Sequence, residues 1–125
     1  MRILRRLIGA RNYVGPTMHA LGLQFGAAPL IGKSLAVIAD ARKPSRDPQL
    51  IVERLLTMSG EDAVTVHRKH RDPWTGQLPV RFIVLSNEVP SFADASGALS
   101  SRFVVLVQVE SWLGREDRPG EQARR

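Results

Sequence analysis

Uninterrupted apolar runs between polar residues are the feature that most constrains the fold of this chain. The first run is Leu-Ala-Val-Ile-Ala at residues 35–39, and two others fill most of residues 80–86 and 102–109. A strand that is apolar at every position is typical of a sheet covered on both faces, as parallel sheets are. Helical segments separate the runs, and strands that alternate with helices are characteristic of the α/β class. The sequence therefore predicts an α/β domain with a largely parallel sheet.

The segments between these runs predict helices and one inserted β-hairpin. Residues 2–9 place their apolar side chains on one face and end at Gly9, and we expect another short helix over residues 18–25, after a turn at 15–17. Asp47-Pro48 resembles a helix start, and Gly60 supplies the matching end. Residues 64–67 alternate with period two, which indicates a half-exposed strand, and residues 72–76 have the composition of a turn.

The composition favours a polyanionic partner. The chain has 18 Lys and Arg against 12 Asp and Glu, a formal net charge of +6, and a pI near 11.0. The absence of cysteine excludes disulfides and thiolate metal sites, which fits a reducing cytosol. No apolar run approaches the roughly 20 residues that span a bilayer, so we expect a cytoplasmic protein without a membrane partner.

A Gly-Lys-Ser sequence at residues 32–34 matches the end of a phosphate-binding P-loop, but its spacing and its flanking elements do not fit one. Five residues separate Gly26 from Gly32, whereas the P-loop has four between its glycines. A P-loop also leaves a strand and opens a helix, so that backbone N–H groups hold phosphate. Here the three residues precede an apolar strand, and Pro29 lacks an amide hydrogen. We interpret the segment as a decoy.

Polar residues at the strand boundaries are the candidate catalytic groups. Asp40 follows the first run and Asn87 the second, while Arg102 opens the third. In a parallel sheet the carboxyl ends of the strands line the ligand crevice. A carboxylate that holds Mg²⁺, a polar group that orients water and an arginine that meets phosphate charge are parts that nucleotide hydrolysis uses. The alternatives are a solvated carboxylate, a turn asparagine and an arginine paired with Asp94 or Glu88.

A basic run with a nearby aromatic residue is the candidate nucleic-acid contact. Arg68, Lys69 and Arg71 can neutralise phosphates beside His70, and Trp74 can stack on a base. The alternatives are a solvated charged face and a tryptophan packed in the core. His67 and His70 suggest no metal site, because residues three apart on a strand point to opposite faces.

The same residues carry a resemblance to a known family. The sequence from Leu35 to Asp117 resembles phage and plasmid primase-helicases. The resemblance includes Gly-Lys-Ser before the first run and Leu-Ser-Asn-Glu-Val-Pro at residues 85–90. The similar part is their C-terminal helicase domain, in the superfamily 3 branch of the AAA+ ATPases. The resemblance implies a partial P-loop ATPase core with a mostly parallel sheet and an inserted β-hairpin. It also implies ATP and Mg²⁺ as cofactors and a homo-hexameric ring on single-stranded DNA in the intact family.

The resemblance implies roles for the candidate residues. Asp40 matches the Walker B acid, which holds Mg²⁺ through the nucleotide, although many relatives have two adjacent acids there. Asn87 matches the Walker C sensor and Arg102 the arginine finger. The basic run matches a hairpin that holds DNA in the ring channel, with Lys69 as the channel lysine.

Since no P-loop is encoded, we expect a domain truncated upstream of Walker B over residues 1–114 and a disordered basic tail over 115–125. The missing P-loop strand should leave two strand edges unpaired. Three hypotheses follow. The chain is a helicase fragment that keeps DNA contacts without autonomous ATPase activity, a small basic DNA-binding or interaction protein, or one half of a split ATPase. We expect no bound cofactor for the chain alone.

Overall fold

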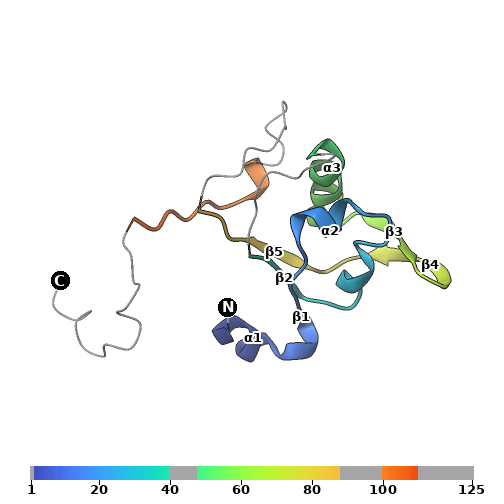
Figure 1. Ribbon diagram of the computed structural model, residues 1–125, viewed down its shortest axis with the longest axis horizontal. Helices are drawn as coiled ribbons and strands as arrows, with labels where there is room; N and C mark the ends of the chain where they lie inside the picture. Colours follow the sequence, from blue (N-terminus) through green and yellow to red (C-terminus); the bar gives the residue numbers. More distant parts are fainter. Residues whose placement is uncertain (1, 40–47, 88–99, 110–125) are drawn as a thin grey trace.

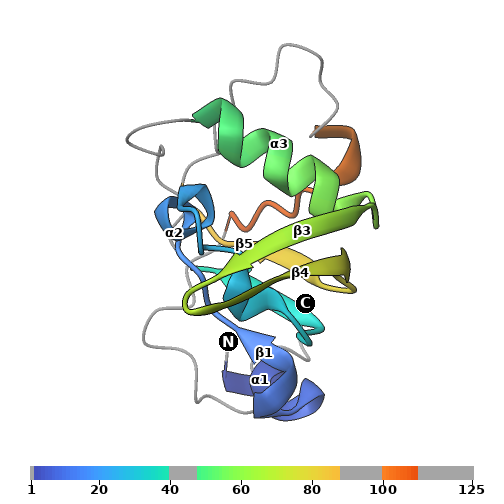
Figure 2. The same cartoon turned by 90° about the vertical axis from the view of Figure 1, so that its right-hand side faces the viewer.

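The computed structural model describes residues 2–39, 48–87 and 100–109 of the chain. The described residues form a mixed α/β structure with a small parallel sheet and a separate antiparallel hairpin, as the apolar runs predict. Helix α3 lies at one end of the molecule and α1 at the other, with the sheet and the hairpin between them (Figures 1 and 2).

The parallel sheet has the strand order β1-β2-β5. Its strands are β1 (Tyr13–Val14), β2 (Leu35–Ile38) and β5 (Arg81–Val84). All four side chains of β2 are buried, and β2 also has a hydrogen-bonded neighbour on each edge. This burial explains why residues 35–38 are apolar at every position, whereas Ala39, beyond the end of β2, is exposed. The short strand β1 was not predicted, because two residues are too few for a periodic pattern to show.

Helix α3 (Pro48–Ser59) provides much of the core. It buries Ile51, Val52, Leu55 and Met58, whose spacing of three and four residues places them on one face. The helix ends at Gly60, whose N–H donates to the Leu56 carbonyl at 2.9 Å. The predicted helix from Pro48 to Gly60 is therefore confirmed over the described residues.

The amino-terminal part contains short helices, two of which were predicted. Helix α1 (Arg2–Ile8) stops at Gly9, whose φ of 84° lies in the left-handed region that favours glycine. The 3₁₀ turn η1 (Ala10–Asn12) leads into β1. Helix α2 (Met18–Gly22) begins at Thr17, whose hydroxyl accepts a hydrogen bond from the Ala20 N–H.

Helix α2 is shorter than the predicted 18–25, because the chain turns back on itself after Gly22. The N–H groups of Leu23 and Gly26 donate to the carbonyls of Ala20 and Leu23 in successive turns. This brings Gly26 against the helix, and a Cβ there would lie 1.7 Å from the Ala20 carbonyl oxygen. The 3₁₀ turn η2 (Ala28–Leu30) then leads toward β2.

The inserted hairpin consists of β3 (Ala63–Arg68) and β4 (Arg71–Gln77). The prediction of a turn at residues 72–76 is wrong, since those residues lie within β4 and the chain reverses at Lys69 and His70. Proline and glycine suggested a turn by composition, but among the described strands β4 pairs with β3 alone, and a proline is tolerated on such an edge strand. Cross-strand pairing therefore outweighed the local composition.

The prediction of a strand over residues 102–109 is also wrong. The 3₁₀ turn η3 (Ser100–Arg102) is followed by residues 103–109, which form no strand and lead away from the sheet (Figure 1). Phe103 packs against the core, whereas the valines and the leucine beyond it are exposed. A strand forms only with a hydrogen-bonding partner, and the described residues supply none here. None of the described helices is both long and apolar enough to cross a membrane.

The close approach at Gly26 makes a testable prediction about stability. We expect Gly26→Ala to lower the free energy of unfolding by about 3 kcal/mol, because the new methyl group forces the backbone after α2 to move. Urea unfolding followed by tryptophan fluorescence measures this change. Gly15→Ala is the matched control, since its Cβ would meet no atom closer than 3.7 Å, and we expect a change within about 0.5 kcal/mol. Equal urea midpoints for the two variants would contradict the prediction.

Candidate nucleic-acid interface

The tip of the β3–β4 hairpin is a basic feature of the described residues. The hairpin projects from the body of the molecule, and its turn is the part farthest from the sheet (Figure 1). Lys69 and His70 form the turn, and His70 adopts a φ of 59°, in the left-handed region. The strand register shifts between Val66 and Arg68, which marks a bulge beside the turn. The tip is therefore a defined loop presented to solvent on a two-stranded stalk.

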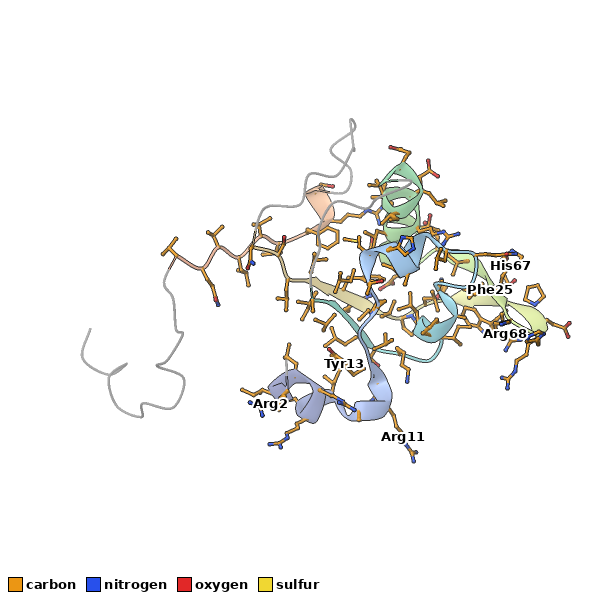
Figure 3. All side chains as sticks on the ribbon, viewed as in Figure 1. Arg2, Arg11, Tyr13, Phe25, His67 and Arg68 are labelled. Atoms are coloured by element: carbon orange, nitrogen blue, oxygen red, sulfur yellow. The ribbon has the colours of Figure 1, made fainter. Side chains whose placement is uncertain are left out.

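Four of the predicted DNA-binding residues lie together at this tip. Lys69, His70 and Arg71 are exposed, and Arg68 is half-buried. The Arg68 Nε donates to the Asp72 carbonyl oxygen at 2.9 Å, which holds the guanidinium beside the turn. Figure 3 shows Arg68 at the projecting end of the hairpin. The structure thus gathers three cationic side chains and a histidine within one turn.

The fifth predicted residue, Trp74, lies on the stalk. It pairs with the buried Val66 and packs, half-buried, against the hydrophobic core. Its ring covers Gly76, where a Cβ would lie 2.7 Å from the ring. On the outer face, the hydroxyls of Thr65 and Thr75 lie 3.1 Å apart across the two strands. The tryptophan therefore anchors the hairpin to the body, and a base could reach only its exposed part.

The carboxyl ends of β2 and β5 meet at one edge of the sheet. The strands pair in register up to Ile38 and Val84, and the Leu85 N–H donates to the Ile38 carbonyl at 2.8 Å beyond β5. Asn87 lies two residues after Leu85 and is exposed. Asp40 lies outside the described residues, two positions after the end of β2. The adjacency of the two strand ends is the part of the predicted nucleotide site that the structure describes.

Arg102 lies at the opposite edge, beside the carboxyl end of α3. Its Nη1 donates to the Leu56 carbonyl at 3.3 Å, and Gly60 is in close proximity. Glu61, which follows Gly60, forms an ion pair of 2.7 Å with Arg81 at the amino end of β5. The contacts described for Arg102 are therefore with the end of α3. A cation at a helix carboxyl end is favourable, because the last carbonyls carry partial negative charge.

Gly32-Lys33-Ser34 leads into β2 and not into a helix, as predicted. The Ser34 N–H donates to Asn12, the Ser34 carbonyl accepts from Arg81, and both bonds extend the sheet. The Lys33 Nζ donates to the Arg11 carbonyl, so the lysine is used within the fold. Among the described residues, no three His, Asp or Glu side chains gather closely enough to hold a metal ion.

A second exposed basic group was not singled out from the sequence. Arg2, Arg5 and Arg6 on α1 are exposed, and α1 buries none of its side chains. The sequence Arg-Arg-Leu-Ile at residues 5–8 is a visible signal, but this helix was predicted from its apolar face and not from its arginines. Figure 3 shows Arg2 and Arg11 at the end of the molecule away from α3.

The family comparison concerns most of this structure. A family model described as a family of unknown function, DUF5906, matches residues 1–102. The chain belongs to DUF5906. The match covers the parallel sheet, α3, the hairpin and Arg102 of this DUF5906 chain. No solved structure matches it.

The position of Arg102 predicts a structural effect. We expect Arg102→Ala to lower the free energy of unfolding by about 0.5–1 kcal/mol, because the carboxyl end of α3 loses a cationic donor. Arg102→Lys keeps the charge and should lose less. Arg71→Ala removes an exposed arginine at the hairpin tip without touching a helix end, and it should leave the urea midpoint unchanged. Unchanged stability in Arg102→Ala would show that the contact with α3 contributes nothing.

Proposed function

We propose that this chain holds single-stranded DNA through the tip of the β3–β4 hairpin. The observation that carries the proposal is the exposed basic turn at residues 68–71 on a projecting two-stranded stalk (Figure 1). Single-stranded nucleic acid is bound by cationic side chains that follow its phosphates and by aromatic rings that stack on its bases. The turn supplies the cations, and the exposed part of Trp74 supplies the ring.

The excess of positive charge at the turn supports this proposal. Three cationic side chains lie beside one acidic residue, Asp72, whose backbone carbonyl accepts a hydrogen bond from Arg68. The other cations of the turn, Lys69 and Arg71, are exposed, so phosphate can approach them without displacing any bond described for the fold. Salt-sensitive binding of a polyanion follows from such an arrangement.

The parallel sheet supports a finer proposal, that the chain derives from the ATPase module of a phage or plasmid replication primase-helicase. In such a module the Walker B acid and the Walker C sensor follow neighbouring strands. Here β2 precedes Asp40 and β5 precedes Asn87, and the two strands are parallel neighbours. ATP, Mg²⁺, the arginine-finger role of Arg102 and the hexameric ring belong to this proposal. Its setting would be the cytoplasm of a bacterium or of a phage-infected host cell.

Two alternatives give the same hairpin a different context. A small basic DNA-binding protein without enzymatic activity needs the hairpin alone. One half of a split ATPase needs a second polypeptide at the sheet. The edge of β5 that does not face β2 has no strand partner among the described residues, which is what the split form requires. DNA binding by the hairpin is common to all three.

The hairpin proposal predicts a loss of DNA affinity when the exposed cations of the turn are removed. We expect Lys69→Ala with Arg71→Ala to weaken single-strand binding about 20-fold at 0.1 M salt, because two phosphate contacts are lost. The slope of log affinity against log salt should flatten by about 1.4, or about 0.7 for each contact. Fluorescence anisotropy of a labelled oligonucleotide across a salt series measures both quantities.

The matched control is Arg2→Ala with Arg5→Ala, which removes the same charge from α1. We expect this control to keep most of the affinity, and an equal loss in both double variants would refute the hairpin as the site. A Trp112→Phe background assigns the tryptophan emission to Trp74. Quenching of this emission by DNA is expected if a base stacks there. Unchanged emission would limit Trp74 to its packing role.

We expect no ATP hydrolysis above background by the chain alone. Lys33, the lysine of the Gly-Lys-Ser sequence, is bonded to the Arg11 carbonyl, and the sequence enters a strand without forming a phosphate cradle. A coupled phosphate-release assay with Mg²⁺ and single-stranded DNA tests this expectation. Turnover that disappears in Asp40→Ala or Asn87→Ala would contradict it and would support an autonomous ATPase.

A further inference from the structure

Residues 104–109 form the largest exposed apolar stretch among the described residues. Val104, Val105, Leu106, Val107 and Val109 are each between 66% and 90% exposed. Gln108 is the one polar residue of this stretch. Isolated exposed apolar residues are ordinary, but a contiguous run of large ones marks an interaction site or an aggregation hazard. This segment is therefore the described surface best suited to an apolar partner.

The composition of the segment indicates what kind of partner it needs. Valine and leucine at successive positions place apolar side chains on both faces of an extended chain, as in the inner strands of a sheet. Buried strand β2 has the same pattern, with all four side chains covered. Residues 104–109 thus have the sequence of an inner strand in the environment of an exposed loop.

Strand β5 lacks a strand partner on one edge among the described strands, and it could therefore accept such a segment. Its residues Phe82, Ile83 and Val84 are as apolar as those of β2, yet each is only half-buried. The difference follows from the strand order, because β2 lies between two strands and β5 pairs with β2 alone among the described strands. An edge strand with apolar side chains on both faces is a template for strand addition.

The chain does not pair these two parts with each other. Arg102 is bonded to Leu56 at the carboxyl end of α3, and Phe103 packs against the core, which fixes where the segment starts. From there residues 103–109 lead away from the body (Figure 1), and no pairing with β5 forms. Among the described residues, an unpaired strand edge and an exposed apolar segment therefore coexist in one chain.

We infer that two copies of this chain associate by exchanging residues 104–109, each segment adding as a strand to the β5 edge of the other copy. Both complementary parts lie on the same chain, so a second copy satisfies both at once. A reciprocal exchange closes on itself with two-fold symmetry, and it gives each β5 edge a strand partner and each exposed segment a sheet to join. Each chain has a formal net charge of +6, so two copies repel each other overall. The exchanged segment itself carries no charge, so this repulsion is not concentrated at the contact.

Sedimentation equilibrium of the full chain tests the association. We expect a mass of twice 13.8 kDa at micromolar concentration. Val105→Lys with Val107→Lys should shift the dissociation constant at least a hundredfold toward the monomer. These side chains are 66% and 74% exposed, so the monomer should fold unchanged by circular dichroism. Ile3→Lys with Leu7→Lys is the matched control, because these residues are 75% and 76% exposed on α1 and receive the same charge.

The absence of cysteine allows a direct test of the contact. We expect Ile83→Cys and Leu106→Cys chains, mixed and treated with a short bismaleimide, to give a cross-linked dimer that contains one chain of each. Ile3→Cys mixed with Leu106→Cys should give none. A folded monomer at all concentrations would overturn the inference. So would a dimer unaffected by the Val105 and Val107 changes, or an open-ended polymer.

Discussion

Burial of β2 between two parallel neighbours is the constraint on which the rest of the structure depends. It pairs along its whole length with β5 and at Leu35 and Ala36 with β1, and its four side chains are buried, so most of its backbone is bonded and its apolar surface is kept from water. The register of β2 with β5 brings the two strand ends to one edge of the sheet. The inserted hairpin also leads directly into β5, which fixes where its stalk leaves the body.

Arginines bonded to helix ends explain part of the basic composition without nucleic acid. Arg54 of α3 donates from Nη1 to the carbonyls of Leu21 and Leu23, where α2 ends, and Arg102 reaches the end of α3. Arg81 is paired with Glu61. Helix-end carbonyls need donors, and a guanidinium offers several in a fixed plane. The net charge alone therefore overstates the number of cations available to a polyanion. The position of each cation on the surface decides whether it can contact one.

Sequence reasoning succeeded where one local pattern determined the structure and failed where a distant partner did. The apolar run of β2 and the spacing of Ile51 and Leu55 in α3 were sufficient, because burial and periodicity leave few alternatives. The segment 72–76 has the composition of a turn and becomes a strand only because β3 pairs with it. Residues 103–109 have the composition of a strand and form none, since no neighbour pairs with them. For the site, the basic run at residues 67–71 was visible in the sequence, but its place at the turn of the hairpin was not, nor was the contact of Arg102 with a helix end 46 residues away.

In the hairpin, the residues that pack against the core are different from the cationic residues exposed at the turn. Successive residues of a strand alternate between faces, so Val66 and Trp74 lie against the core while Thr65 and Thr75 line the outer face. A shift of one residue in the register would expose the tryptophan and bury the threonines, and the cost of that exchange keeps the register fixed. The cations at the turn lie beyond this anchored part and take no share in core packing. They can therefore be replaced without unfolding the protein, so a change in binding there reports on the turn itself.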